Sequence, residues 1–182
     1  MIETWEALGS QTSQQQEPAA QHLCFWLGEQ SYALPVEQVQ EIRATGAWST
    51  LPGSPHWVLG VMNLRGLVIP LYDLRLRFGV APGSQASAVP VLIVVAAKGK
   101  LAGLVVDGVM DVTDIPAASV RPAGGGSSME ARCVAGVATL GQSVAIILDA
   151  GALMCEDGPG REQSVAVEGG ERDGGNDVAM VQ

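Results

Sequence analysis

The sequence predicts an all-β protein built from two small barrels in tandem, with polar segments at both ends. Three features indicate this fold: short apolar runs, turn residues at tight spacing between them, and an internal repeat. Short strands separated by Gly, Pro and Asn turns are typical of small barrels rather than of open sheets. Hydrophobic residues make up 47% of the 182 residues and aromatic residues only 4%, so the core must consist mainly of aliphatic side chains.

The internal repeat has two parts. At an offset of 70 the chain matches Leu34 with Leu104, Val36 with Val106, Glu37 with Asp107, Val39 with Val109, and Glu41 with Asp111. At an offset of 76 it matches Gly60 with Gly136, Val61 with Val137, Leu64 with Leu140, Val68 with Val144, Leu71 with Ile147, and Asp73 with Asp149. The change of offset indicates an insertion, for which the Gly/Ser run at 124–128 is the expected place. Two copies of this length predict duplicated units rather than a solenoid.

The first unit is expected at residues 22–80. Strands are predicted at 23–27 and 31–34 around a turn at 28–30, with a helical turn from 35 to 39 and extended structure at 41–43. Another strand is expected at 47–51, and Pro52-Gly53-Ser54-Pro55 forms a turn. A hairpin of 60–64 and 67–71 follows around Arg65-Gly66, and a helical turn at 73–78 ends at Gly79.

The second unit is expected at residues 88–155, after a linker of small residues at 81–87. Its predicted strands are 89–97, 101–106 and 109–112, followed by a hairpin of 133–140 and 143–148 around Gly141-Gln142 and a helical turn at 150–154. Residues 1–21 are expected to be a flexible arm, with a short amphipathic helix possible at 2–8. Residues 156–182 contain seven acids and six glycines, so we expect a disordered tail.

Charge and cysteine content exclude several classes of function. The net charge is −9, and the seven acids and two arginines after Cys155 account for −5 of it. This acidity argues against nucleic-acid binding. The three cysteines are far apart and form no CxxC motif, so neither a metal nor another cofactor is expected, and Cys24 and Cys133 are predicted to be buried thiols. No signal peptide is expected, and no apolar run approaches the roughly 20 residues of a membrane helix.

Signatures of catalysis are absent from the sequence. It has no phosphate-binding GxxxxGK[ST] loop, no GxGxxG after a strand and no GxSxG elbow. His22 and His56 are expected in surface or capping roles, although an enzyme using His56 with Asp73 stays open as an alternative. Asp107, Asp111 and Asp114 lack the pattern of a calcium loop and are expected to be solvated. Solvated positions are also expected for Arg75 and Arg77.

The two copies differ at the predicted hairpin tip. The first copy has Arg65 where the second has Gly141. Turn geometry requires no arginine there, although Gly66 can supply a positive φ. One hypothesis is an exposed solubilising charge. The other is an Arg–carboxylate pair with Glu41, which holds one strand against another or faces a partner.

Several ordered motifs resemble the CheW family of chemotaxis coupling proteins. They are FxLG at 25–28 before YALP at 32–35, VQEIR at 39–43, GVMNLRG at 60–66, IPLYDLR at 69–75, VVDGV at 105–109 and Arg121-Pro122. The resemblance covers residues 21–155. It implies two tandem five-stranded SH3-like barrels and a non-enzymatic adaptor. Such an adaptor couples methyl-accepting chemoreceptors to a CheA-type histidine kinase in cytoplasmic arrays at the membrane.

The resemblance also implies partners and binding residues. Receptor-binding positions of the family match Val39, Glu41, Gly60, Arg65, Val109 and Val112. A weaker match places kinase contacts at Ala47, Trp48, Leu51 and Val58. The implied partners are the regulatory domain of the kinase, the cytoplasmic tip of the receptor and other CheW-like proteins, without nucleic acid or membrane insertion. The alternative is a scaffold of a non-flagellar chemosensory pathway that binds the kinase or array partners without touching receptors.

Overall fold

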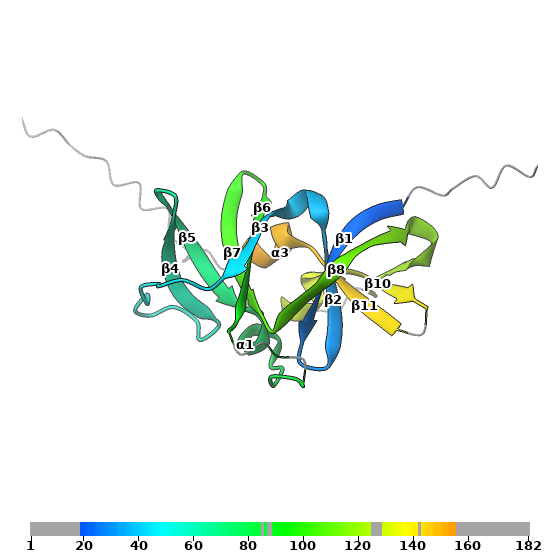
Figure 1. Ribbon diagram of the computed structural model, residues 1–182, viewed down its shortest axis with the longest axis horizontal. Helices are drawn as coiled ribbons and strands as arrows, with labels where there is room; N and C mark the ends of the chain where they lie inside the picture. The colour runs from blue at the N-terminus through cyan, green and yellow to red at the C-terminus, as the bar shows by residue number, and fades with distance from the viewer. Residues whose placement is uncertain (1–18, 85, 87–88, 125–128, 142, 156–182) are drawn as a thin grey trace, which may run out of the picture.

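The computed structural model describes residues 19–84, 86, 89–124, 129–141 and 143–155, which form two β-sheets beside each other (Figure 1). One sheet has six strands in the order β8-β1-β2-β11-β10-β9, and the other has five in the order β3-β6-β7-β5-β4. The predicted all-β class is therefore confirmed. The arm at 1–18, with the helix expected at 2–8, and the tail at 156–182 lie outside the described residues.

The strands of the six-stranded sheet are β1 (Ala19–Leu27), β2 (Gln30–Pro35), β8 (Gly108–Pro116), β9 (Val120–Pro122), β10 (Val134–Leu140) and β11 (Ser143–Leu148). Those of the five-stranded sheet are β3 (Val39–Ala44), β4 (Val58–Leu64), β5 (Leu67–Asp73), β6 (Val91–Ala97) and β7 (Lys100–Val106). The short helices are η1 (Val36–Gln38), α1 (Leu74–Phe78), η2 (Ala117–Ser119), α2 (Met129–Arg132) and α3 (Ala150–Cys155). Among all these strands and helices, β9, η2 and α2 were not predicted.

The internal repeat is confirmed by the pairing register. In the hairpin β4–β5, Leu64 pairs with Leu67 and a bulge lies between Val58 and Gly60. In the hairpin β10–β11, each pair and the bulge recur 76 residues later. The hairpins β1–β2 and β6–β7 also share one register, at an offset of 70. The two copies therefore have the same local structure.

The division into units 22–80 and 88–155 is corrected by the sheet topology. The hairpin β1–β2 of the first copy joins β8–β11 of the second, and the hairpin β6–β7 of the second copy joins β3–β5 of the first. Two parallel contacts complete the exchange, β11 with β2 and β5 with β7. The repeat shows which segments are alike, but like hairpins can pair with the strands of either copy. Each sheet therefore contains strands from both halves of the chain.

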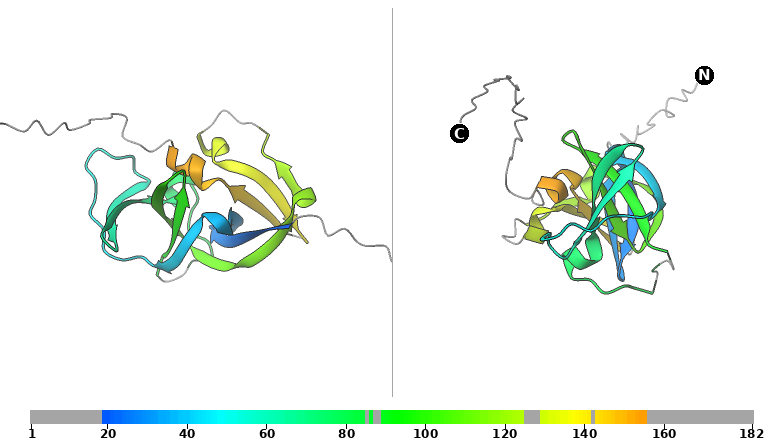
Figure 2. Two further views of the ribbon diagram at one scale, coloured as in Figure 1. Left: turned by 90° about the horizontal axis from the view of Figure 1, so that it is seen from above. Right: turned by 90° about the vertical axis from the view of Figure 1, so that its left-hand side faces the viewer.

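Three hydrophobic clusters follow from this arrangement, because successive side chains of a strand point to opposite faces. Leu23, Phe25 and Leu27 pack in the largest cluster, which lies between the two sheets and also contains Ile93, Val95, Leu104, Leu148 and Leu153. A second cluster fills the five-stranded sheet and contains Met62, Leu64, Ile69, Leu71, Leu92, Val94 and Val105. A third fills the six-stranded sheet and contains Cys24, Ala33, Ile115, Ala138, Ala145 and Ile147. The shared cluster joins the sheets into one body, with α3 at their junction (Figure 2).

The strand expected at 47–51 is not formed. Only Ser49 makes a bridge there, to Val61 of β4. Its counterpart in the second copy is β9, which pairs with β10 through Arg121 and Val137. By contrast, the helical turn after β5 is confirmed. The carboxylate of Asp73 accepts hydrogen bonds from the backbone N–H groups of Arg75 and Leu76, and Gly79 ends α1 with φ 63°.

Candidate functional site

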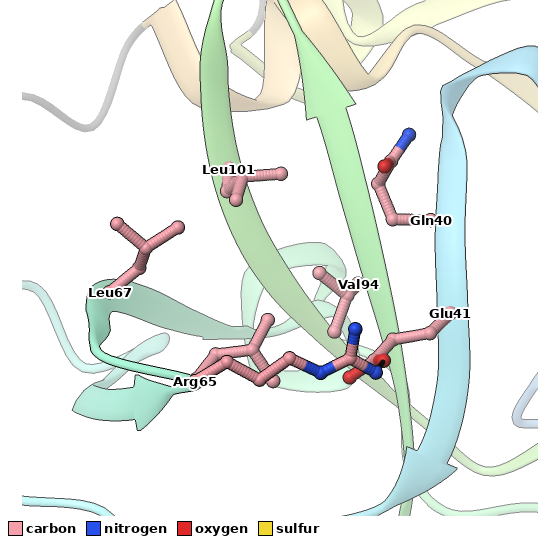
Figure 3. Close-up of a pocket in the computed structure, with 7 residues that line it drawn as sticks. Gln40, Glu41, Arg65, Leu67, Val94 and Leu101 are labelled. Atoms are coloured by element: carbon pink, nitrogen blue, oxygen red, sulfur yellow. Dashed lines mark hydrogen bonds and ion pairs between the residues drawn. The ribbon is translucent and has the colours of Figure 1, made fainter.

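Arg65 and Glu41 form the ion pair that the sequence suggested. Arg65 lies at the tip of the hairpin β4–β5, and its Nη2 donates to Oε2 of Glu41 on β3. The side chain of Arg65 is 80% exposed and that of Glu41 is 21% exposed. Figure 3 shows Arg65 extending from the turn toward Glu41. The pair connects β3, one of the outermost strands of the five-stranded sheet, with the turn that follows the other outermost strand, β4.

Stability alone does not account for an arginine at this tip. Arg65 has φ 53°, a left-handed conformation that costs a residue with a Cβ about 1–2 kcal/mol. An exposed ion pair returns only about 0–1 kcal/mol, and salt screens it. Gly141 occupies the equivalent position with φ 62° at no such cost. The arginine is therefore better explained by what its exposed guanidinium can contact.

A shallow hollow of about 170 Å³ lies beside this ion pair. Its lining residues come from five strands and one turn: Gln40, Glu41, Leu64, Arg65, Leu67, Val94 and Leu101. Small-molecule sites usually enclose about 300–1,000 Å³. The hollow is thus sized for a side chain of a partner. Leu67, which was not predicted as a binding residue, lines the hollow and is 57% exposed, and the next residue, Val68, is 68% exposed.

Three predicted receptor-binding residues lie at the junction of the sheets. Val39 on β3 and Val109 on β8 are half-buried and pack against the same shared cluster. Val112 pairs with Leu23, and Val109 pairs with Phe25, so both valines lie on the face of β8 that is turned toward this cluster. Val112 remains 52% exposed. Val39 and Val109 thus contact one hydrophobic cluster, the first from β3 and the second from β8.

Gly60 is not part of this group. It is buried on β4 with φ 141°, and a Cβ there would lie 2.0 Å from the carbonyl oxygen of Ser49. Gly136 has the same relation to the carbonyl oxygen of Arg121, at 2.9 Å. The glycine therefore lets a neighbouring segment lie directly against the strand in each copy. This local packing explains Gly60 without a contact to a partner.

The predicted kinase-binding residues lie on and after the loop that follows β3. Ala47 is exposed, as are Trp48 (44%) and Leu51 (43%). Val58, at the start of β4, is half-buried and packs against the shared cluster. Ile42 on β3, the strand before this loop, is 45% exposed. Large exposed apolar side chains close together are a common mark of a protein-binding surface.

A largely buried polar cluster links the two sheets, and the prediction that its members Arg75 and Asp107 are solvated was wrong. Arg75 donates from Nε and Nη2 to Asp73 at 3.0 and 2.6 Å, and from Nη1 to Asp107 Oδ1 at 3.1 Å. Asp107 is 1% exposed, and its Oδ2 accepts from the backbone N–H of Gly28 at 2.7 Å. The hydrogen bonds with Asp73 raise the pKa of Arg75 above its usual value.

Arg77 is also buried rather than solvated. Its Nη1 donates to the carbonyl oxygen of Leu153 on α3 at 3.1 Å, and its Nη2 lies 3.6 Å from Sγ of Cys133. The guanidinium lies 5.9 Å from the ring centre of Trp57, a cation–π distance. Burial of a long cation follows no local sequence pattern, because the carbonyl that accepts from it lies 76 residues away.

The enzyme alternative required His56 and Asp73 together. His56 is exposed and contacts Trp57 edge-on, whereas Asp73 is buried and accepts from Arg75 and the start of α1. His22 is buried, and its Nδ1 lies 2.9 Å from the carbonyl oxygen of Ala20. Within the described residues, no group of three or more His, Cys, Asp or Glu side chains is arranged to hold a metal ion. No helix in the described part of the chain is long and apolar enough to span a membrane.

Cys24 and Cys133 are buried thiols, as predicted. Burial raises the pKa of Cys24, because the thiolate would lose its hydration. The Cys24 thiol is therefore poorly suited to nucleophilic chemistry.

The fold and these surfaces define a protein of two small β-barrels whose exposed features suit contacts with other proteins. The family model of the CheW-like domain matches residues 21–157, so the chain belongs to this family. The chain is 34% identical over 128 residues to the chemotaxis protein CheW of Klebsiella aerogenes, covering 70% of this chain and 76% of that protein. It is 32% identical over 124 residues to protein FrzA of Myxococcus xanthus, covering 68% and 76%.

A solved structure confirms the fold. The crystal structure of the scaffolding protein TtCheW from Thermoanaerobacter tengcongensis matches with a TM-score of 0.68 and 30% identity, covering 75% of this chain and 92% of that one. The SH3-like barrels implied by the resemblance are thereby confirmed.

Proposed function

We propose that this chain is a non-enzymatic adaptor that couples methyl-accepting chemoreceptors to a CheA-type histidine kinase in a cytoplasmic signalling array. Membership of the CheW-like family carries this proposal, and the scaffolding protein of the same fold supports it. The surface also supports it, because the hollow beside Arg65 is smaller than a usual small-molecule site and is lined in part by the exposed apolar side chain of Leu67.

The receptor side of the adaptor is the junction where Val39 and Val109 meet the shared cluster. A chemoreceptor tip is a helical hairpin, and a helix binds through an apolar stripe in a groove. Half-buried Val39 and Val109 with the exposed Val112 offer such an apolar strip. Glu41 follows Val39 by two residues on β3, and its ion pair with Arg65 adds charge to this strand, where it can select a register of the helix.

The kinase side is the exposed apolar loop with Trp48 and Leu51. A barrel can pair with a similar barrel through a moderate apolar patch, and weak contacts of this kind become strong when many are linked in an array. A tryptophan that is buried on binding is a frequent hot spot of an interface. We therefore expect Trp48→Ala to weaken kinase binding and to leave receptor binding unchanged.

Co-sedimentation with the kinase and with receptor cytoplasmic fragments, separately and together, tests the proposal. The expected result is binding to each partner alone and a larger pellet with both. Binding to the kinase without binding to receptors would instead support the scaffold of a non-flagellar pathway. Turnover of a metabolite by the purified protein would contradict the proposal.

The charge reversal Arg65→Glu sharpens this test. It places an acid beside Glu41 at an exposed turn, so the protein should stay folded and bind the kinase while receptor binding weakens. The matched control is Arg121→Glu, the same reversal at an exposed position of the other sheet. Equal loss of both bindings together with a lower Tm would show that Arg65 is structural.

A further inference from the structure

One short helix contacts both sheets. The helix α1 follows β5 of the five-stranded sheet, and Asp73 caps its start. From α1, Phe78 stacks on Tyr32 of β2 with ring centres 5.8 Å apart, and Arg75 reaches Asp107. The tyrosine belongs to the six-stranded sheet. The helix α1 therefore helps to fix the position of one sheet relative to the other. The exchange of hairpins already joins the two copies within each sheet.

Asp107 lies where the chain crosses from one sheet to the other. It follows β7 of the five-stranded sheet and immediately precedes β8 of the six-stranded sheet. Its two carboxylate oxygens accept from different places, Oδ1 from Arg75 and Oδ2 from the N–H of Gly28 in the β1–β2 turn. Its own N–H donates to the carbonyl oxygen of Trp26 at 3.2 Å. This one buried residue therefore fixes where β8 begins.

The equivalent crossover in the first copy has a different construction. The counterpart of Asp107 is Glu37, which is exposed, and the counterpart of Arg75 is Gly151, which has no side chain. There, Oε1 of Gln38 accepts from the N–H of Ala150 at 3.1 Å. The Arg75–Asp107 ion pair therefore has no equivalent between Gly151 and Glu37, and it is specific to the crossover into β8, the strand that carries Val109 and Val112.

We infer that Arg75 and Asp107 are positioning residues, which fix β8 against the five-stranded sheet and so set the separation of β3 and β8 at the proposed receptor groove. This inference rests on the proposed function. Val109 lies two residues after Asp107, so a shift at the crossover moves this side chain directly. Val39 is held by its pairing with Val95 and would stay in place. Loosening the cluster should therefore change the width of the groove.

The first test is the substitution Asp107→Asn. An amide keeps the size of the side chain but has only one acceptor oxygen, so either Arg75 or Gly28 loses its partner. Binding of the receptor fragment should weaken by about fivefold. Kinase binding should stay unchanged, because the loop with Trp48 and Leu51 belongs to the five-stranded sheet. The matched control is Glu37→Gln at the other crossover, which should bind both partners as the native chain does.

The second test measures the separation of β3 and β8 without any partner. Spin labels at Arg43→Cys on β3 and Asp114→Cys on β8, both exposed positions, report it in a chain whose three native cysteines are replaced. Asp107→Asn should broaden or shift the distance distribution, and Glu37→Gln should not. An unchanged distribution in Asp107→Asn would overturn the inference. If the native chain fails to bind receptors while Asp107→Asn still shifts the distribution, the proposed function fails but the positioning role stands.

A second variant guards against loss of folding. Arg75→Lys keeps a cation beside Asp73 but lacks the planar fork that reaches two carboxylates at once. Its Tm should change less than that of Asp107→Asn, and its spin-label distances should change in the same direction. Weaker binding of both partners in equal measure, with unchanged distances, would show a general loss of stability and would contradict the inference.

Discussion

The hairpins β4–β5 and β10–β11 have the same backbone but different tips. Their pairing registers agree residue by residue, including the bulge. The first turn residue is left-handed in both, with φ 53° at Arg65 and 62° at Gly141. Only the first copy places a bulky cation there, at a cost to stability that the second avoids. The backbone of the hairpin is therefore common to both copies. The arginine of the first copy is not needed for this backbone, and it adds an exposed charge to the surface.

The largest effect is expected from separating the two copies. Residues 19–84 and 89–155, made as separate chains, should each fail to unfold cooperatively, and mixing them should restore a cooperative transition. The reason is that β3 and β5 find their partners β6 and β7 only in the other half. Thermal unfolding followed by circular dichroism is the measurement. A cooperative transition of 19–84 alone would show that its own hairpin β1–β2 can replace β6–β7.

A smaller effect, equal in the two copies, is expected at matched core positions. Leu34 and Leu104 are repeat partners, both 0% exposed in the shared cluster. Leu34→Ala and Leu104→Ala should each lower the free energy of unfolding by about 2–5 kcal/mol. The control Val68→Ala, at a 68% exposed position, should change it by less than about 0.5 kcal/mol. The free energy of unfolding is measured by chemical denaturation. A loss at only one of the two leucines would contradict the shared core.

The smallest effect is expected from giving the second tip the residue of the first. Gly141→Arg introduces a Cβ at φ 62°, so it should destabilise the protein by about 1 kcal/mol. Receptor binding should not improve, because the tip of β10–β11 is in the other sheet from Glu41 and β3. Tm and receptor affinity are measured on the same preparation. A gain in affinity would show that any exposed cation suffices.

The sequence was sufficient for local structure. Turn residues and apolar runs predicted the hairpins, the helical turn after β5 and its end at Gly79, because these depend on neighbours in the chain. The pair of Arg65 with Glu41 was one of the two hypotheses for this arginine, and it came from the difference between the copies at that tip.

The exchange of hairpins could not be predicted in the same way. An internal repeat identifies similar segments. From the sequence alone, each of two similar hairpins could pair with the strands of either copy. The buried cluster of Arg75 and Asp107 was missed for a related reason, because its partners lie 32 residues apart and meet only after the exchange. One difference between the copies could have indicated this cluster. The first copy has Glu37 where the second has the shorter acid Asp107, and only Asp107 is buried.

The most direct test of the central claim, that the first hairpin tip carries an arginine for a partner, is the receptor affinity of Arg65→Gly with its Tm. The variant gives the first tip the residue of the second. The account predicts an unchanged or higher Tm and receptor binding weakened by at least about fivefold. A lower Tm with unchanged receptor binding would contradict it.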